Sequence, residues 1–120
     1  MPRRQPEGKI KDECRDKHAK PNGLIFWQIE GKSRNGIPDT LAEQVQGRCM
    51  LIEFKVPGEE PTDQQWLRIW ELRQTGQEAW WTDSVEGYRR LVGLDPGGYD
   101  VVYPDRILEL VKLGTVADKL

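Results

Sequence analysis

Cys49-Met50-Leu51-Ile52-Glu53-Phe54-Lys55 predicts the centre of the fold. Gly36-Ile37-Pro38-Asp39, which lies upstream of it, adds to this prediction. A run that is nearly all apolar until Glu53 predicts a strand buried on both faces of a sheet. Side chains alternate between the faces of a strand, so Glu53 and Lys55 point the same way. The sequence therefore predicts a central strand that brings a carboxylate and an ammonium group to one point.

A carboxylate that binds a cation, with an ammonium group beside it, suits hydrolysis of a phosphodiester. At neutral pH this reaction requires a metal-activated water and positive charge near the phosphoryl oxygens. Mg²⁺ takes oxygen ligands and is usually held by one or two carboxylates plus substrate phosphate. Asp39 and Glu53 supply two carboxylates, and the backbone carbonyl of Phe54 could supply a third oxygen. We therefore expect a metal-dependent phosphodiesterase site with Lys55 beside the metal.

Each of these pieces also has a purely structural interpretation. Glu53 and Lys55 could form an exposed pair that serves only solubility. Pro38-Asp39 could simply be a turn, because Pro and Asp are favoured turn residues. His18 is the only histidine of the chain, which nearly excludes a catalytic triad or an imidazole-based metal site.

Composition places the chain among small globular domains. With 120 residues, 37% of them hydrophobic and 32% charged, it has room for a single core. No segment is apolar for long enough to cross a bilayer, and the N-terminus lacks the apolar centre of a signal peptide. We expect a cytoplasmic protein. Cys14 and Cys49 are too few for a disulfide framework, and we expect ordinary apolar packing of both.

Charge is distributed unevenly along the chain, whose formal net charge is -2. Residues 1–35 hold nine Lys and Arg against five Asp and Glu, whereas residues 36–120 hold nine against fifteen. A basic N-terminal third could follow a phosphate backbone. Charge alone favours the simpler alternative of a solvated helix face.

Periodicity and breaker residues predict an alternating order of elements. We expect helices over residues 6–20, 61–75, 84–92 and 105–113, and extended segments over residues 24–29, 39–46, 49–55, 79–82 and 99–103. Strand, helix, strand and helix in the second half imply a right-handed crossover. The predicted fold class is α/β, with a mixed central β-sheet flanked by helices.

At this point the residues resemble a known family. The order Glu7, Gly36-Ile37-Pro38-Asp39, Ile52-Glu53-Phe54-Lys55, Gln65 and Gly76 is similar to the VRR-NUC domain of the PD-(D/E)XK nuclease superfamily. Small stand-alone members are typical of bacteriophages. The resemblance covers roughly residues 6 to 92 and implies a restriction-endonuclease-like core. We therefore expect a nuclease core over residues 1–92 and a C-terminal extension over residues 93–120, packed on the core or on a partner subunit.

The resemblance also implies roles for individual residues. Asp39 and Glu53 would be the central metal ligands for Mg²⁺ or Mn²⁺, and Glu7 on the first helix would complete the acidic set. Lys55 would orient the attacking water and stabilise charge. Gln65 would support the site from the side. Gln65 also has a structural alternative, because Thr62 and Gln65 form a capping-box pattern at a helix start. The choice of Glu7 has alternatives too, because Asp12, Glu13 and Asp16 lie on the same predicted helix.

Two functions from different classes follow. The first is a metal-dependent DNA endonuclease in replication, recombination or repair. It would be selective for Holliday junctions or other branched DNA, and in a phage-encoded protein it would act in the host cytoplasm. The alternative is a non-catalytic module that binds nucleic acid or protein on the same fold. The chain has five tryptophans, which we expect in core packing or in a subunit interface. Together with the resemblance, they favour a homodimer. Such a dimer would present two active sites to two strands of branched DNA.

Overall fold

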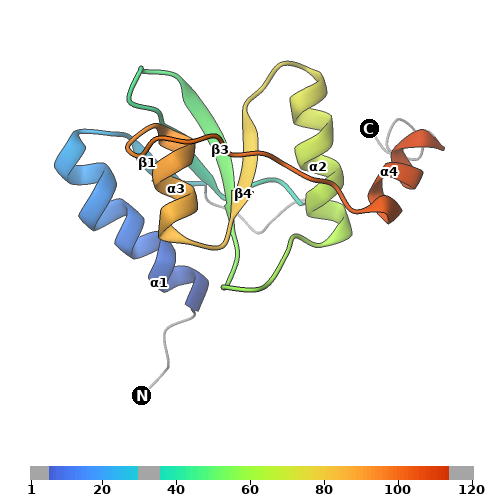
Figure 1. The fold of residues 1–120 in the computed structure, drawn as a ribbon, viewed down its shortest axis with the longest axis horizontal. Helices are drawn as coiled ribbons and strands as arrows, with labels where there is room; N and C mark the ends of the chain where they lie inside the picture. The colour runs from blue at the N-terminus through green and yellow to red at the C-terminus, as the bar shows by residue number, and fades with distance from the viewer. Residues whose placement is uncertain (1–5, 30–35, 114–120) are drawn as a thin grey trace.

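The structure is a computed structural model that describes residues 6–29 and 36–113. For residues 6 and 7 it describes the backbone alone. The predicted alternation of elements is present along the chain (Figure 1). The elements are, in order, α1 (Pro6–Glu13), η1 (Cys14–Ala19), η2 (Lys20–Asn22), β1 (Phe26–Gln28), β2 (Thr40–Glu43), β3 (Cys49–Phe54), α2 (Asp63–Gln74), β4 (Ala79–Thr82), α3 (Val85–Val92) and α4 (Asp105–Lys112).

The sheet has the strand order β1-β2-β3-β4 and is mixed, as predicted. The pairs β1–β2 and β2–β3 are antiparallel, whereas β3 and β4 are parallel. Parallel neighbours require a crossover connection, and α2 supplies it here. β3 therefore occupies the centre of the fold, with a hairpin on one side and a crossover strand on the other.

Helices pack on both faces of the sheet, and β3 separates the two packing environments. On one face Met50, Ile52 and Phe54 of β3 join residues of η1 and α3 in the hydrophobic core. On the other face Leu51 lies across a shallow apolar hollow from Leu72 of α2. Because side chains alternate along β3, those on one face contact η1 and α3, and those on the other face contact α2.

An aromatic cluster fills the core between β1, β3 and α3. The rings of Phe26, Phe54 and Tyr88 lie with centroids 5.7–6.4 Å apart. Cys14 of η1 is fully buried in the same core, as expected for an apolar filler, whereas Cys49 is exposed. Burial raises the pKa of the Cys14 thiol to about 12.

Two predicted strands are shorter in the structure than expected. β1 covers only Phe26–Gln28, although the Ile25 carbonyl accepts from the Glu43 N–H and the Ile25 N–H donates to the Glu43 carboxylate, both at 3.0 Å. β2 ends at Glu43, before the predicted residue 46. Just beyond it, the N–H of Val45 donates to the carbonyl of Val92 in α3 at 2.8 Å instead of to a neighbouring strand.

The prediction for the first helix needs correction. The first helix continues past Glu13 only as the wider π-helix η1 and the tighter 3₁₀-helix η2. Residues 99–103, which were predicted to be extended, belong to no helix and pair with no strand. Tyr99 packs its ring on Trp80 and donates its hydroxyl to the Trp81 carbonyl at 2.7 Å.

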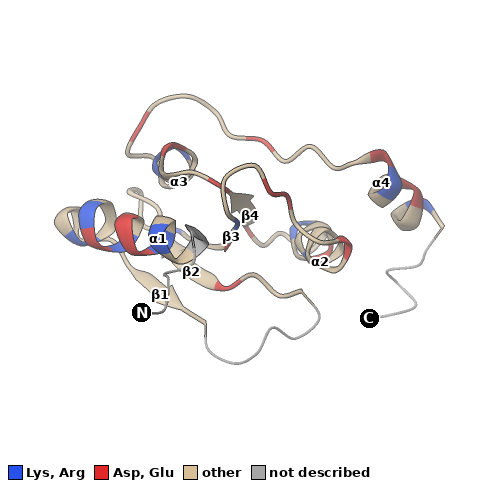
Figure 2. Cartoon of the chain, turned by 90° about the horizontal axis from the view of Figure 1, so that it is seen from below, with Lys and Arg blue, Asp and Glu red and all other residues tan. Residues whose placement is uncertain are grey.

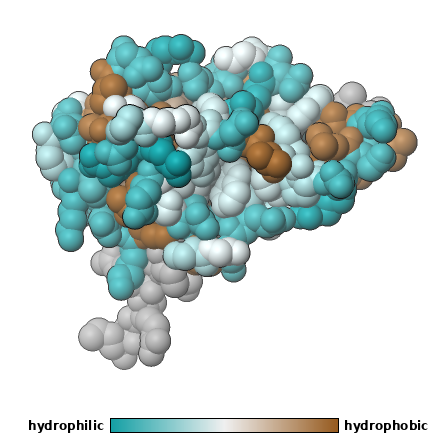
Figure 3. Space-filling view, in the orientation of Figure 1, coloured by the Kyte–Doolittle hydropathy of each residue, from teal (hydrophilic) through white to brown (hydrophobic). Residues whose placement is uncertain are grey.

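The segment after α3 runs back across the molecule to α2. The ring of Tyr103 packs against Trp66, and Ile107 of α4 is fully buried. Arg106 forms ion pairs with Glu60 and Asp63 beside the start of α2. Apolar atoms gather on the surface over α4 (Figure 3), where Leu113 is exposed.

Charges on the first helical segment are of both signs (Figure 2). Arg15 pairs with Asp12 and Asp16, and Lys20 lies 3.8 Å from Asp16. Local pairing therefore offsets the charge of two of the nine Lys and Arg residues in residues 1–35. None of the helices in the described segments has the length and apolar character to cross a membrane.

Candidate active site

A glycine allows the loop before β2 to lie directly against α2. Gly36 has φ +77°, and a Cβ atom added there would lie 2.6 Å from the Gln64 carbonyl oxygen. Only glycine fits both the positive φ and this close approach. Pro38 is fully buried behind it. The Gly36-Ile37-Pro38 sequence thus fixes the path of the chain into Asp39 beside the start of α2.

The register of the hairpin brings the two predicted carboxylates together. Thr40 of β2 is paired with Ile52 of β3. Extending this antiparallel register by one residue places Asp39 opposite Glu53, where side chains share one face of a sheet. Glu53 is only 6% exposed, and Asp39 is partly exposed. The two acids therefore lie at one end of the sheet, with one of them largely removed from water.

Gln65 connects the helix start to this end of the sheet. Its Nε2 donates to Glu53 Oε2 at 3.1 Å, and its Oε1 accepts from Lys55 Nζ at 3.3 Å. The same Oε1 accepts from the Thr62 N–H at 2.9 Å, and Thr62 Oγ1 accepts in return from the Gln65 N–H. Gln65 thus forms the predicted capping box of α2 and also contacts the side chains of Glu53 and Lys55.

Lys11 is a member of this corner that the sequence analysis did not identify. Its Nζ lies 2.9 Å from Asp39 Oδ2, and its side chain is 14% exposed. The other carboxylate oxygen, Asp39 Oδ1, accepts a hydrogen bond from Thr40 Oγ1 at 3.0 Å. Lys11 stands four residues after Glu7, one helical turn away, which is the only signal in the sequence that points to it.

The acidic residues of the first helix do not all reach the site. Asp12, Glu13 and Asp16 line a shallow hollow on α1 and η1 together with basic residues. Glu7 belongs to α1, but its side chain falls outside the described residues. Within residues 8–29 and 36–113, no three acidic, His or Cys side chains cluster in a way that would hold a metal ion.

The donors at this corner nevertheless suit a hard divalent cation. Asp39 and Glu53 offer carboxylate oxygens, and the main chain of Phe54 follows Glu53 directly at the end of β3. Oxygen donors of this kind match Mg²⁺, which commonly uses one or two protein carboxylates and several waters. The residues present therefore fit a magnesium or manganese ion. Lys55 is connected to Glu53 by Gln65, which forms a hydrogen bond with each of them.

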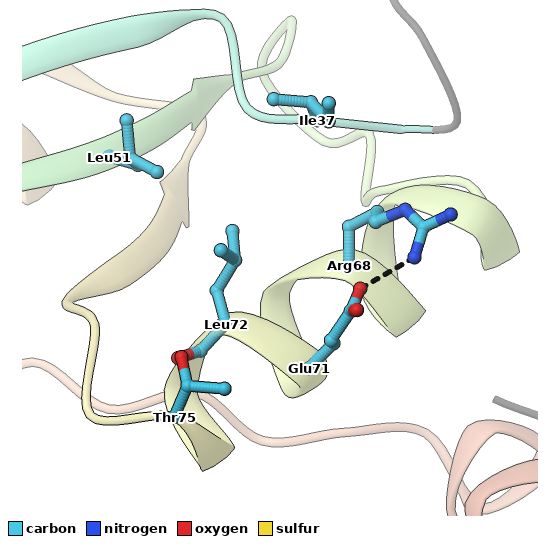
Figure 4. A pocket seen from close by; sticks show the side chains of 6 residues that line it. All are labelled: Ile37, Leu51, Arg68, Glu71, Leu72 and Thr75. Atoms are coloured by element: carbon cyan, nitrogen blue, oxygen red, sulfur yellow. Dashed lines mark hydrogen bonds and ion pairs between the residues drawn. The ribbon is translucent and has the colours of Figure 1, made fainter. Parts of the chain in front are cut away.

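A second hollow lies beside the same loop but has a different character. It measures about 320 Å³ and is lined by Ile37, Leu51, Leu72 and Thr75, with the ion pair of Arg68 and Glu71 at its rim (Figure 4). Neither Asp39 nor Glu53 lines it. The hollow separates β3 from α2 and is not the place where the two acids converge.

Comparisons with known proteins agree with this geometry. No protein-family profile matches the chain. A relative in Acyrthosiphon pisum secondary endosymbiont phage 1, described as "Putative nuclease p44", is 28% identical over 81 residues, which are 64% of this chain and 87% of that protein. A solved VRR_NUC domain superposes with a TM-score of 0.59 at 15% identity, covering 91% of this chain and 97% of that domain.

The structural match confirms the fold that the sequence resemblance implied. A TM-score of 0.59 over nearly the whole of both chains shows a shared fold, although the two sequences are only 15% identical. The mixed sheet, its crossover helix and the helices that flank it are therefore those of the VRR_NUC domain.

Proposed function

We propose that this chain, which has the fold of the VRR_NUC domain, is a nuclease that hydrolyses phosphodiester bonds in DNA with Mg²⁺ or Mn²⁺. One observation carries the proposal: Asp39, Glu53 and Lys55 converge at one end of the sheet, where Gln65 links Glu53 to Lys55. The description of the phage relative as a nuclease supports the same reaction class.

In this proposal, Asp39 and Glu53 would hold the metal ion with the Phe54 carbonyl, and Glu7 would contribute from α1. Bound there, the ion would lower the pKa of a coordinated water and act as a Lewis acid toward the phosphoryl oxygens. Lys55 orients the attacking water and balances the negative charge that develops on the phosphorus oxygens. Gln65 holds the Lys55 and Glu53 side chains in place. Water adds across one P–O bond: phosphorus retains the hydroxyl group, and the leaving sugar oxygen receives a proton.

We also propose that the substrate is branched DNA and that the protein acts as a homodimer. β1 is an edge strand of the sheet, and its Trp27 side chain is 60% exposed. An exposed aromatic residue on an open edge suits pairing with a second copy. A two-fold dimer would present two equivalent sites, as cleavage of two strands at a junction requires.

Cleavage of a labelled DNA panel tests the function. The panel holds single-stranded, duplex, flapped and four-way-junction DNA, each with Mg²⁺, Mn²⁺ or EDTA. Wild type is compared with Lys55→Ala and with Lys112→Ala, a matched change at a lysine that is 77% exposed on α4. We expect metal-dependent cutting by wild type and Lys112→Ala, and none by Lys55→Ala.

The outcomes separate the parts of the proposal. Unchanged cutting by Lys55→Ala would overturn the assignment of Lys55. Binding of DNA without cutting in any metal would favour the non-catalytic binding module. Preference for the four-way junction over duplex would support the branched substrate, and sedimentation at micromolar protein would report whether the active species is a dimer.

A further inference from the structure

Lys11 and Lys55 stand at the same corner but make different kinds of contact. Lys55 donates to the neutral amide of Gln65 at 3.3 Å. Lys11 lies 2.9 Å from Asp39 Oδ2 and forms an ion pair with it. Lys11 is thus in direct ionic contact with Asp39, a proposed metal ligand.

Charge balance explains what this contact does without a metal ion. Asp39 lies opposite Glu53 in the extended register, and like charges at such cross-strand positions destabilise a sheet. The Lys11 ammonium places a positive charge against one of these acids, in a setting where the lysine side chain is 14% exposed. Such partial burial strengthens the attraction relative to water. The corner is thereby nearly neutral before any metal ion arrives.

The same contact places a positive charge on the carboxylate that a metal ion would use. Asp39 Oδ2 faces Lys11, and Oδ1 accepts from Thr40 Oγ1. A divalent cation that binds either oxygen of Asp39 would lie close to the Lys11 ammonium unless it displaced it. Two cations at one carboxylate repel each other, so Lys11 and the metal ion would compete for this carboxylate.

We propose that Lys11 is a positioning residue that holds Asp39 in the metal-free protein and competes with the divalent metal ion for its carboxylate. The inference rests on the proposed metal-dependent function. It has two opposite consequences. Removing the positive charge of Lys11 strengthens metal binding, and it weakens the metal-free fold. An ordinary supporting salt bridge would instead lose metal affinity on removal, because Asp39 would lose its orientation.

Calorimetric titration with Mn²⁺ in the absence of DNA tests the competition. Lys11→Met keeps the length and apolar stem of the side chain but removes the charge. Lys11→Arg keeps the charge, and Lys9→Met removes the charge of an exposed lysine on the same helix. We expect Lys11→Met to bind Mn²⁺ about 5-fold tighter than wild type or more. Lys11→Arg and Lys9→Met should stay near wild type.

Thermal unfolding provides a second measurement that needs no activity. In EDTA we expect Lys11→Met to unfold at a lower temperature than wild type and Lys9→Met. Saturating Mn²⁺ should then raise the unfolding temperature of Lys11→Met more than that of wild type, because tighter binding to the native state stabilises it more. If Lys11→Met does not fold, Mn²⁺ affinity in Lys11→Gln, which is also uncharged, takes its place.

The outcomes distinguish this inference from the proposed function. If wild type binds Mn²⁺ and the uncharged variants bind it equally or more weakly, the competition is overturned and the nuclease proposal stands. If wild type binds no Mn²⁺, and Asp39→Asn changes nothing, the metal site and the inference fall together. Tighter binding by Lys11→Met that disappears in the Lys11→Met/Asp39→Asn double variant establishes that the effect passes through Asp39.

Discussion

The two faces of β3 differ in what holds their side chains. Met50, Ile52 and Phe54 point into a core of apolar and aromatic neighbours, and Ile52 and Phe54 are fully buried. Beyond Leu51, the other face carries Glu53 and then Lys55, and each of these side chains forms a hydrogen bond with Gln65. One strand therefore serves both the stability of the domain and the proposed chemistry.

This difference predicts whether a substitution on β3 lowers stability or activity. Apolar packing is non-directional and spread over many contacts, so a core side chain contributes through the volume that it fills. Each polar contact at the active-site corner depends on one partner at one distance, so loss of a single group removes its effect completely. Substitutions on the first face should lower stability, and those on the second should lower activity.

Phe54→Ala should have the largest effect, on the core face. The Phe54 ring is fully buried and packs against Phe26 and Tyr88. Truncating a buried phenylalanine typically costs about 3 to 5 kcal/mol through lost burial and a residual cavity. Urea denaturation of the metal-free protein measures this loss. A change below about 1 kcal/mol would contradict the division between the two faces.

Gly36→Ala should disturb both faces, because it separates α2 from the loop that leads to Asp39. The added Cβ would meet the Gln64 backbone at 2.6 Å in a positive-φ conformation. We expect a loss of about 2 to 3 kcal/mol and reduced cleavage even where the protein remains folded. Gly58→Ala has a similar φ of +87° with open space around it. Activity should be lost in the first variant and retained in the second.

The sequence alone predicted most of the fold because its signals are local. The apolar run at β3, the capping box at Thr62 and the cap at Ser84 placed their elements within a few residues. The bounds differ where contacts distant in the sequence intervene. The N–H of Val45 bonds to the Val92 carbonyl of α3, where β2 was predicted to continue.

The candidate site was predictable only in part. A fixed spacing on one strand identifies Glu53 and Lys55, and the turn residues identify Asp39. Lys11 lies 28 residues from Asp39 in the chain, and its spacing of four residues from Glu7 is the only local pattern that distinguishes it from the other lysines of the first helix. Only the packing of α1 against the end of the sheet selects it.

Cys14 gives the stability of the core face a pH dependence. Burial raises the pKa of the Cys14 thiol from 9.0 to about 12, so the native state retains a proton that the unfolded chain loses. The stabilisation is complete below pH 9 and is lost as the pH rises toward 12. We expect a loss of roughly 1 to 2 kcal/mol by about pH 10.

Urea denaturation at neutral and alkaline pH measures this loss. Cys14→Ala should remove most of the decrease up to about pH 10, and Cys49→Ala should leave it unchanged because that thiol is exposed. Equal pH dependence in wild type and Cys14→Ala would contradict the assignment of the decrease to the Cys14 thiol.

Substitutions of Thr62 and Gln65 separate an effect on stability from an effect on cleavage, because the two residues share one capping box. Thr62→Ala removes the cap on the Gln65 N–H and should cost about 1 kcal/mol, yet Gln65 keeps its contacts with Glu53 and Lys55. Gln65→Ala removes the reciprocal cap and both contacts, so cleavage should fall roughly 10- to 100-fold. Comparable stability with unequal activity would establish that Gln65 acts at the site. Equal activity in the two variants would reduce Gln65 to a helix cap.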